Sequence, residues 1–222
     1  MPSSAPITVP PLIVHGTTVR CTHGRWITMV GNAPGKSNSQ SGRPVKATVF
    51  CGTSLDGFIA RTNDGLDFLE AAGGEDHGFT EFLASVDAIV MGRRTFEVVL
   101  TFGSWPYGAK PVVVLSSRPL DIPAFPGAVI EHMAGTPAEI VSRLAARGVG
   151  HIYVDGGATI QQFLEAGLIQ RLVISRVPVL IGSGIPLFGP LSSDIVVRHV
   201  ATRAFPGGLV QSEYLVDRAP VA

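Results

Sequence analysis

The sequence has little charge and almost no cysteine. Only 15% of its 222 residues are charged, and 17 basic residues balance 17 acidic ones. A chain without net charge lacks the basic surplus that binds nucleic acid or an anionic membrane, so we expect neither partner. Its two cysteines, Cys21 and Cys51, lie far apart and outside any CxxC or His/Cys ligand pattern. This spacing supports neither a disulfide framework nor a metal site, and it favours a reducing cytoplasm.

Long hydrophobic runs are also absent. No apolar stretch reaches the roughly 18 to 20 residues that a membrane helix needs, and the N-terminus lacks the pattern of a secretion signal. The hydrophobic content of 45% nevertheless predicts a globular domain with a full core. Residues 1–44 are rich in Pro, Ser, Gly and Thr, so we expect a flexible N-terminal extension there. The domain is expected over residues 45–222.

Short apolar runs typical of buried parallel strands alternate with helix-like patterns along this domain. The strand patterns cover 45–51, 88–91, 111–115, 129–130, 152–154 and 171–181, and the helix patterns cover 79–86, 93–100, 137–146 and 160–168. Two further strands alternate about the turn Pro206-Gly207-Gly208. The sequence therefore predicts an α/β fold, with a central mostly parallel sheet, flanking helices and a C-terminal antiparallel hairpin.

Groups suited to phosphate follow three of the predicted strands. They are Gly92-Arg93-Arg94-Thr95, Ser116-Ser117-Arg118 and Gly156-Gly157. Taken singly, a glycine pair is more often a tight turn and an arginine pair is more often a solvated helix face. Together they indicate a dinucleotide site, because open α/β sheets bind ligands at the carboxyl ends of their strands. The GxGxxG fingerprint of the Rossmann fold is missing, so another dinucleotide fold is expected.

Five motifs carry a resemblance to a known family. They are Ser54-Leu-Asp-Gly-Phe-Ile-Ala60, Met91-Gly-Arg-Arg-Thr-Phe96, Val114-Leu-Ser-Ser-Arg-Pro-Leu120, Val154-Asp-Gly-Gly-Ala158 and Pro178-Val-Leu-Ile-Gly-Ser-Gly-Ile-Pro-Leu-Phe188. In order and spacing the chain resembles the dihydrofolate reductase superfamily, and within it the C-terminal reductase domain of the riboflavin-biosynthesis deaminase-reductase. The deaminase motif, His-x-Glu with a following Pro-Cys-x-x-Cys, is absent, so a stand-alone relative is expected.

The resemblance implies an NADPH-dependent reductase that passes hydride to a small polar heterocyclic or carbonyl substrate. The similar family activity is that of 5-amino-6-(5-phosphoribosylamino)uracil reductase. Fourteen site residues follow, twelve for the cofactor and two for the substrate. By resemblance, Ile59 and Ala60 line the nicotinamide pocket, Gly92, Arg93 and Thr95 hold cofactor phosphates, Ser116, Ser117 and Arg118 bind the 2′-phosphoadenosine end, and Gly156, Gly157, Ala158 and Thr159 bind the pyrophosphate.

Two carboxylates compete for the substrate. Asp76 lies sixteen residues before Gly92 (92 − 76 = 16), at the offset of the pterin-orienting acid in dihydrofolate reductases. Asp56 is the rival, although a turn aspartate bonding its own backbone is an equal interpretation. Dihydrofolate reductase activity and a non-catalytic NADPH-binding module remain the alternatives. A homodimer is expected by resemblance and from the apolar loop Val179 to Phe188.

Overall fold

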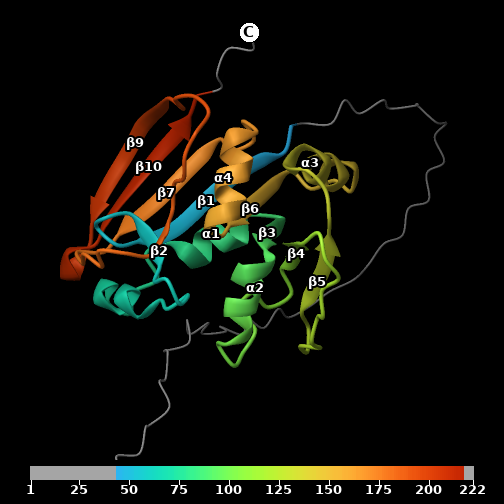
Figure 1. Cartoon of the computed structure of the whole chain (residues 1–222), viewed down its shortest axis with the longest axis horizontal. Coiled ribbons are helices and arrows are strands. Elements are labelled where there is room, and N and C mark those ends of the chain that lie inside the picture. The colour runs from blue at the N-terminus through green and yellow to red at the C-terminus, as the bar shows by residue number, and fades with distance from the viewer. Residues whose placement is uncertain (1–43, 218–222) are drawn as a thin grey trace, which may run out of the picture.

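The structure is a computed structural model that describes residues 44–217. The extension predicted over 1–44 therefore lies, apart from Pro44, outside the described residues. Figure 1 shows one twisted sheet that runs through the whole molecule with helices on both faces. Its strand order is β5-β4-β3-β6-β1-β7-β10-β9. The strands are β1 Lys46–Thr53, β3 Ala88–Gly92, β4 Pro111–Leu115, β5 Val129–Met133, β6 His151–Asp155, β7 Arg171–Arg176, β9 Val197–Ala204 and β10 Val210–Val216.

Six neighbouring strands of this sheet, from β5 to β7, are parallel. β10 then pairs antiparallel with both β7 and β9, and a short 3-10 turn, η2 (Pro206–Gly208), joins the two C-terminal strands. This arrangement confirms the predicted mostly parallel sheet with its C-terminal hairpin. A second small sheet, which the sequence did not predict, pairs β2 (Phe58–Ala60) with β8 (Ile185–Pro186).

The helices form two layers because successive strand residues point to opposite faces. α3 (Pro137–Ala146) and α4 (Gly157–Glu165) cover one face, where Phe163 is fully buried beside strand residues such as Val154. α1 (Phe79–Ser85) and α2 (Arg93–Leu100) cover the other face, where Phe96 packs against Met91. None of the helices between residues 44 and 217 is long and apolar enough to cross a membrane.

Two local predictions need correction, and one short helix was not predicted. The strand predicted over 171–181 ends at Arg176, since Pro178 has no N–H for a sheet ladder. The apolar residues after it pack instead against the unpredicted 3-10 helix η1 (Asp67–Ala72). Phe68 of η1 is only 4% exposed, which fixes this segment to the domain. Leu168 lies beyond the end of α4, although it still packs against the core.

The connections of the sheet create a cleft at one point. β3 and β6 are parallel neighbours, but α2 leaves the end of β3 toward one face and α4 leaves the end of β6 toward the other. The two segments that follow β3 and β6 therefore separate at the carboxyl ends of these strands. A topological switch of this kind is where open α/β sheets form ligand sites.

Candidate cofactor and substrate site

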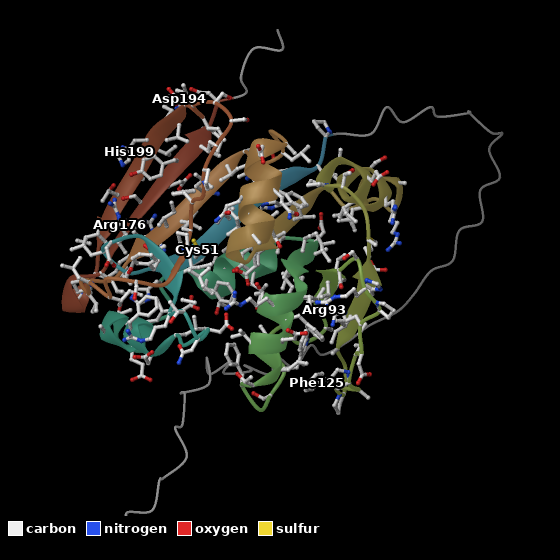
Figure 2. All side chains as sticks on the ribbon, viewed as in Figure 1. Cys51, Arg93, Phe125, Arg176, Asp194 and His199 are labelled. Atoms are coloured by element: carbon white, nitrogen blue, oxygen red, sulfur yellow. The ribbon has the colours of Figure 1, made fainter. Side chains whose placement is uncertain are left out.

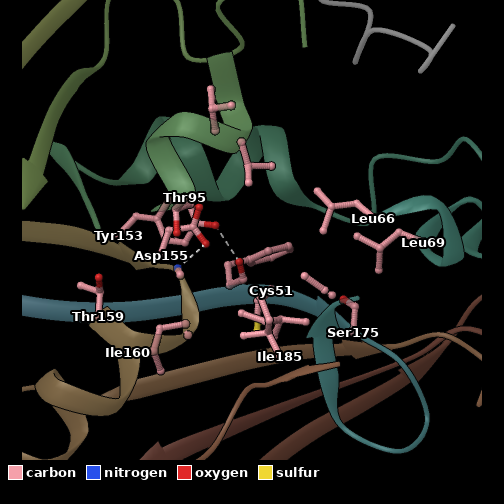
Figure 3. Close-up of a pocket in the computed structure, with 18 of the residues that line it drawn as sticks. Cys51, Leu66, Leu69, Thr95, Tyr153, Asp155, Thr159, Ile160, Ser175 and Ile185 are labelled. Carbon is pink, nitrogen blue, oxygen red and sulfur yellow. Dashed lines mark hydrogen bonds between the residues drawn. The ribbon is translucent and has the colours of Figure 1, made fainter. Parts of the chain in front are cut away.

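A cavity of about 700 Å³ lies at this switch point. Figure 3 shows Thr95, Tyr153 and Asp155 at one side of it and Leu66 and Leu69 at the other. Ten of the fourteen predicted site residues line the cavity. They are Ile59, Ala60, Asp76, Gly92, Arg93, Thr95, Gly156, Gly157, Ala158 and Thr159. The folded chain thus brings together residues from three of the five motifs, along with Asp76 and Thr159.

The starts of α2 and α4 are locked together by two glycine–threonine contacts. A Cβ on Gly92, the residue before α2, would lie 2.8 Å from the hydroxyl oxygen of Thr159 in α4. A Cβ on Gly156, the residue before α4, would overlap the hydroxyl oxygen of Thr95 in α2. Each glycine therefore makes room for a threonine of the opposite helix. This close approach holds both helix starts at the same cavity.

Both helix starts offer free donors to an anion. Neither Gly92 nor Gly156 caps its helix through a side chain, and among residues 44–217 the only side-chain acceptor at these starts is the Asp155 carboxyl, which is bonded to the Gly156 N–H. The first N–H groups of an uncapped helix carry partial positive charge and favour phosphate. Two such starts facing one cavity have the donor chemistry that a dinucleotide pyrophosphate needs.

The two glycines of the second turn have different tasks, which the sequence did not separate. Gly156 has the left-handed φ of 88°, so this position strongly favours glycine. Gly157 is already helical, and a Cβ there would lie 3.0 Å from Ile59 Cδ1 and 3.2 Å from the Pro186 carbonyl oxygen. The close packing at Gly157 is therefore against β2 and β8, and the backbone constraint belongs to Gly156.

Arg93 fastens the loop after β4 to the start of α2 (Figure 2). Its Nε donates to Ser116 Oγ at 3.0 Å, and its Nη2 donates to the carbonyl oxygens of Arg118 and Pro119. The side chains of Ser116, Ser117 and Arg118 do not line the cavity among the described residues. Their predicted role at the 2′-phosphoadenosine end stays a prediction, and Arg93 is the physical link between that loop and the cavity.

The two competing carboxylates occupy different places. Asp76 is at the rim of the cavity, but its oxygens accept bonds from the N–H and hydroxyl of Thr80 at 2.8 to 3.1 Å, in the first turn of α1. Asp56 does not line the cavity; its carboxylate accepts bonds from the N–H groups of Ile181 and Gly182 and holds that loop. The structure thus gives both residues a structural contact, and their catalytic roles stay predictions.

Asp155 is the site residue that sequence reasoning missed. It is the last residue of β6, lies in the cavity and accepts a bond from the Gly156 N–H at 2.8 Å. Burial raises the pKa of its carboxyl to about 6, although the bond from Gly156 partly offsets this. Burial, and then the nearby Asp155 charge, also hold the pKa of Tyr107 and Tyr153 above the ordinary phenol value. The available signal was its position directly before the glycine pair.

The described residues contain no candidate metal site. No group of three or more His, Cys, Asp or Glu side chains among residues 44–217 is arranged to hold an ion. The free Cys51 lines the cavity, and burial raises the pKa of its thiol so that it stays protonated at neutral pH.

The mostly parallel sheet, the hairpin at its edge and the site at the switch point define a dihydrofolate-reductase-like protein. The fold matches Enterococcus faecalis dihydrofolate reductase, complexed with NADP(H), with a TM-score of 0.55 at 15% identity over 79% of this chain and 99% of that one. The chain belongs to the RibD C-terminal domain family, whose model matches residues 45–211. This family is a reductase-domain family of the riboflavin-biosynthesis type, which confirms the resemblance predicted from the five motifs.

Two relatives cover most of the chain. A putative riboflavin biosynthesis protein from Shewanella sp. PV-4 is 38% identical, with a TM-score of 0.73, over 78% of this chain and 100% of that one. The uncharacterized protein YwjB of Bacillus subtilis is 30% identical over 77% of this chain and 97% of its own length. The similarity therefore extends over nearly the whole length of each relative.

Because the two helix starts are in close contact, we expect Gly156→Ala to lower the free energy of unfolding strongly. Gly148 is the matched control, because it has a similar φ of 83° but no atom within 4 Å of an added Cβ. We expect Gly148→Ala to lower the free energy of unfolding by about 1 to 2 kcal/mol through the strain of the left-handed backbone alone. Gly156→Ala should lose at least about 1 kcal/mol more, since the methyl group also displaces Thr95. Equal losses in urea unfolding would show that the two helix starts are not locked as described.

The raised pKa of the Asp155 carboxyl predicts that the stability of the fold depends on pH. Its carboxyl pKa rises from an ordinary value of 3.8 to about 6 on folding, so the folded chain holds an extra proton between these values. Its stabilising contribution is present below about pH 4 and is lost as the pH rises through about 6. Relative to wild type, Asp155→Asn should therefore gain melting temperature between pH 4 and pH 8. A difference that stays constant over this range in thermal unfolding would contradict the raised pKa.

Proposed function

We propose that this protein is an NADPH-dependent reductase that acts on a small heterocyclic or carbonyl substrate. The observation that carries the proposal is the convergence of two uncapped helix starts, at Gly92 and Gly156, on one cavity at the switch point of the sheet. Backbone N–H groups of α2 and of Gly157, Ala158 and Thr159 would hold the pyrophosphate. The family relationship and the fold shared with an NADP(H) complex support the choice of cofactor.

The remaining cavity walls suit the reacting half of the cofactor. Ile59 and the nearly buried Ala60 form an apolar wall on β2, which β8 holds in place. Such a wall would support a flat nicotinamide ring and exclude water from it. NADPH, when bound, supplies the hydride, and the protein contributes position and electrostatics.

Asp155 is the group that we propose to handle the proton. Its carboxyl lies in the cavity with a pKa of about 6, so a useful fraction holds a proton near neutral pH. A protonated Asp155 would donate to a heteroatom of the substrate beside the carbon that is reduced. Asp76 and Asp56 stay weaker proposals for this step, because their carboxylates are occupied by Thr80 and by the loop at Ile181.

We also propose that the protein is a homodimer. The predicted apolar loop exposes Leu180 and Phe188, which are 69% and 47% exposed. The edge strand β9 adds Val197 and Val200 to the apolar surface, at the opposite edge of the sheet from β5. Apolar surface that exceeds a few hundred Å² in one patch is typical of interfaces. Light scattering at micromolar concentration should give twice the chain mass of 23.3 kDa, and a monomeric mass would contradict the dimer.

Cofactor preference tests the proposed site. Arg118 is exposed, and its guanidinium is free to meet a 2′-phosphate, whereas Arg93 also fastens the loop. We expect wild type to bind NADPH more tightly than NADH. Arg118→Ala should lower the affinity for NADPH about tenfold to a hundredfold, because a charge-assisted hydrogen bond is lost. NADH binding should be unchanged. Arg93→Ala should weaken the binding of both cofactors, since the whole loop after β4 loses its attachment to α2.

Calorimetric titration with each cofactor provides the measurement. Arg198→Ala, an exposed arginine of β9 outside the cavity lining, is the control for a lost surface charge. Equal weakening of NADPH and NADH by Arg118→Ala would remove Arg118 from the 2′-phosphate. Failure of wild type to bind NADPH at all would contradict the proposed function itself.

A further inference from the structure

The part of the cavity away from the two helix starts is apolar. It is lined by Leu66, by Leu69 and Ala72 of η1, and by Val177 and Leu209. Figure 3 shows Leu66 and Leu69 on the opposite side of the cavity from Thr95 and Asp155. Leu69 and Ala72 pack against the buried cluster that contains Val177 and Leu209, so this wall is a firm part of the domain. It offers hydrophobic surface to the substrate.

The charges around the cavity are mainly acidic. Four carboxyl groups line it against two guanidinium groups, those of Arg93 and Arg94. The four acids are Asp64, Glu75, Asp76 and Asp155. No lysine is among the described residues that line the cavity. The segment between η1 and α1 lines the cavity with Glu75, Asp76 and His77, and it contributes no lysine or arginine.

Both arginines stand at the start of α2 and are already engaged. Arg94 Nε lies 2.6 Å from Asp64 Oδ1. Arg93 is bound to Ser116 and to two carbonyl oxygens, and its Nη1 lies 3.5 Å from Glu97. Any charge that remains for a ligand is thus on the cofactor side, where the dinucleotide phosphates would use it.

A phosphate monoester on the substrate does not suit these surroundings. Proteins bind such a group with arginine, lysine or several backbone N–H donors, because its double negative charge must be matched when water is removed. Leucine side chains offer no donor, and His77 offers only one unpartnered ring nitrogen, whereas the Glu75 and Asp76 carboxylates would repel the phosphate. A flat uncharged ring, by contrast, gains from contact with the apolar wall.

A neighbouring hollow of about 280 Å³ is the alternative place for a phosphate. It shares Phe50 and His77 with the main cavity and contains Arg171 and Arg203. However, Arg171 Nη2 is paired with Glu213 at 2.7 Å, and Glu81 also lines the hollow. The acids there balance the arginines, so the hollow provides no surplus of positive charge.

We propose that the substrate of this reductase is an uncharged heterocycle without a phosphate group, held between the apolar wall of η1 and Asp155. The inference rests on the proposed function, and it gives this site a substrate class different from the phosphoribosyl compound that the family resemblance implies. Glu75 and Asp76 act against phosphorylated forms of the same ring. The discrimination is therefore electrostatic and depends on residues outside the cofactor site.

A panel of matched pairs tests the proposal. Each pair is a heterocycle with and without its phosphate, including 5-amino-6-(5-phosphoribosylamino)uracil and its dephosphorylated counterpart. NADPH oxidation is followed at saturating cofactor with the full chain. We expect turnover with unphosphorylated members, and rates at least about tenfold lower with their phosphorylated partners. Equal or faster turnover of the phosphorylated member of any reduced pair, or turnover of no pair, would overturn the proposal.

A charge reversal provides the second measurement. Glu75→Lys should reduce the discrimination against phosphorylated compounds on the order of threefold to tenfold, as expected when an exposed repulsion becomes an attraction. Glu70→Lys is the matched control, because Glu70 is an exposed acid of η1 that does not line the cavity. Equal effects of the two variants would contradict the assigned role of Glu75.

Calorimetry with NADPH alone separates this inference from the proposed function. Failure of the wild-type protein to bind NADPH would contradict the proposed reductase function. Normal NADPH binding with preferred turnover of phosphorylated substrates would leave the reductase intact and overturn only the substrate class.

Discussion

The site depends on the close approach of two helix starts. α2 and α4 follow neighbouring parallel strands but pack on opposite faces of the sheet, so their first turns meet only at the strand ends. They come this close because Gly92 leaves space for Thr159 and Gly156 leaves space for Thr95. A side chain at either glycine would push the helices apart and enlarge the gap between their N–H groups. Two helix starts a fixed distance apart suit a ligand with two linked phosphates.

The same arrangement places a carboxyl beside the proposed cofactor site. Asp155 ends β6 directly before the turn at Gly156, so the turn that presents N–H groups to an anion also places a carboxyl in the cavity. Burial of this carboxyl raises its pKa to about 6, although bonds from Gly156 and Tyr153 oppose the rise. The opposite wall, formed by η1, adds hydrophobic surface and acids. In the proposed function, phosphate recognition and substrate recognition would thus be separated by charge within one cavity.

Periodicity and glycine punctuation were sufficient to predict the sheet and the hairpin, and ten of the fourteen predicted site residues line one cavity. The rest depends on contacts that pattern reading does not contain. Asp56 bonds to Ile181, 125 residues away, and nothing local distinguishes this bond from a catalytic role. Asp155 was missed because its burial depends on the folded arrangement around β6, where Tyr107 from the segment after α2 joins Tyr153 of the same strand at the cavity. Gly156 and Gly157 are identical in sequence, and only backbone geometry separates the strained position from the helical one.

A crystal structure of the protein with bound NADPH tests the central claim most directly. The account predicts that pyrophosphate oxygens lie within hydrogen-bond distance of backbone N–H groups in the first turns of both α2 and α4. It also predicts that Thr95 and Thr159 keep their contacts with Gly156 and Gly92. A pyrophosphate bound to the loop at Ser116 to Arg118 alone, with both helix starts facing solvent, would contradict the account.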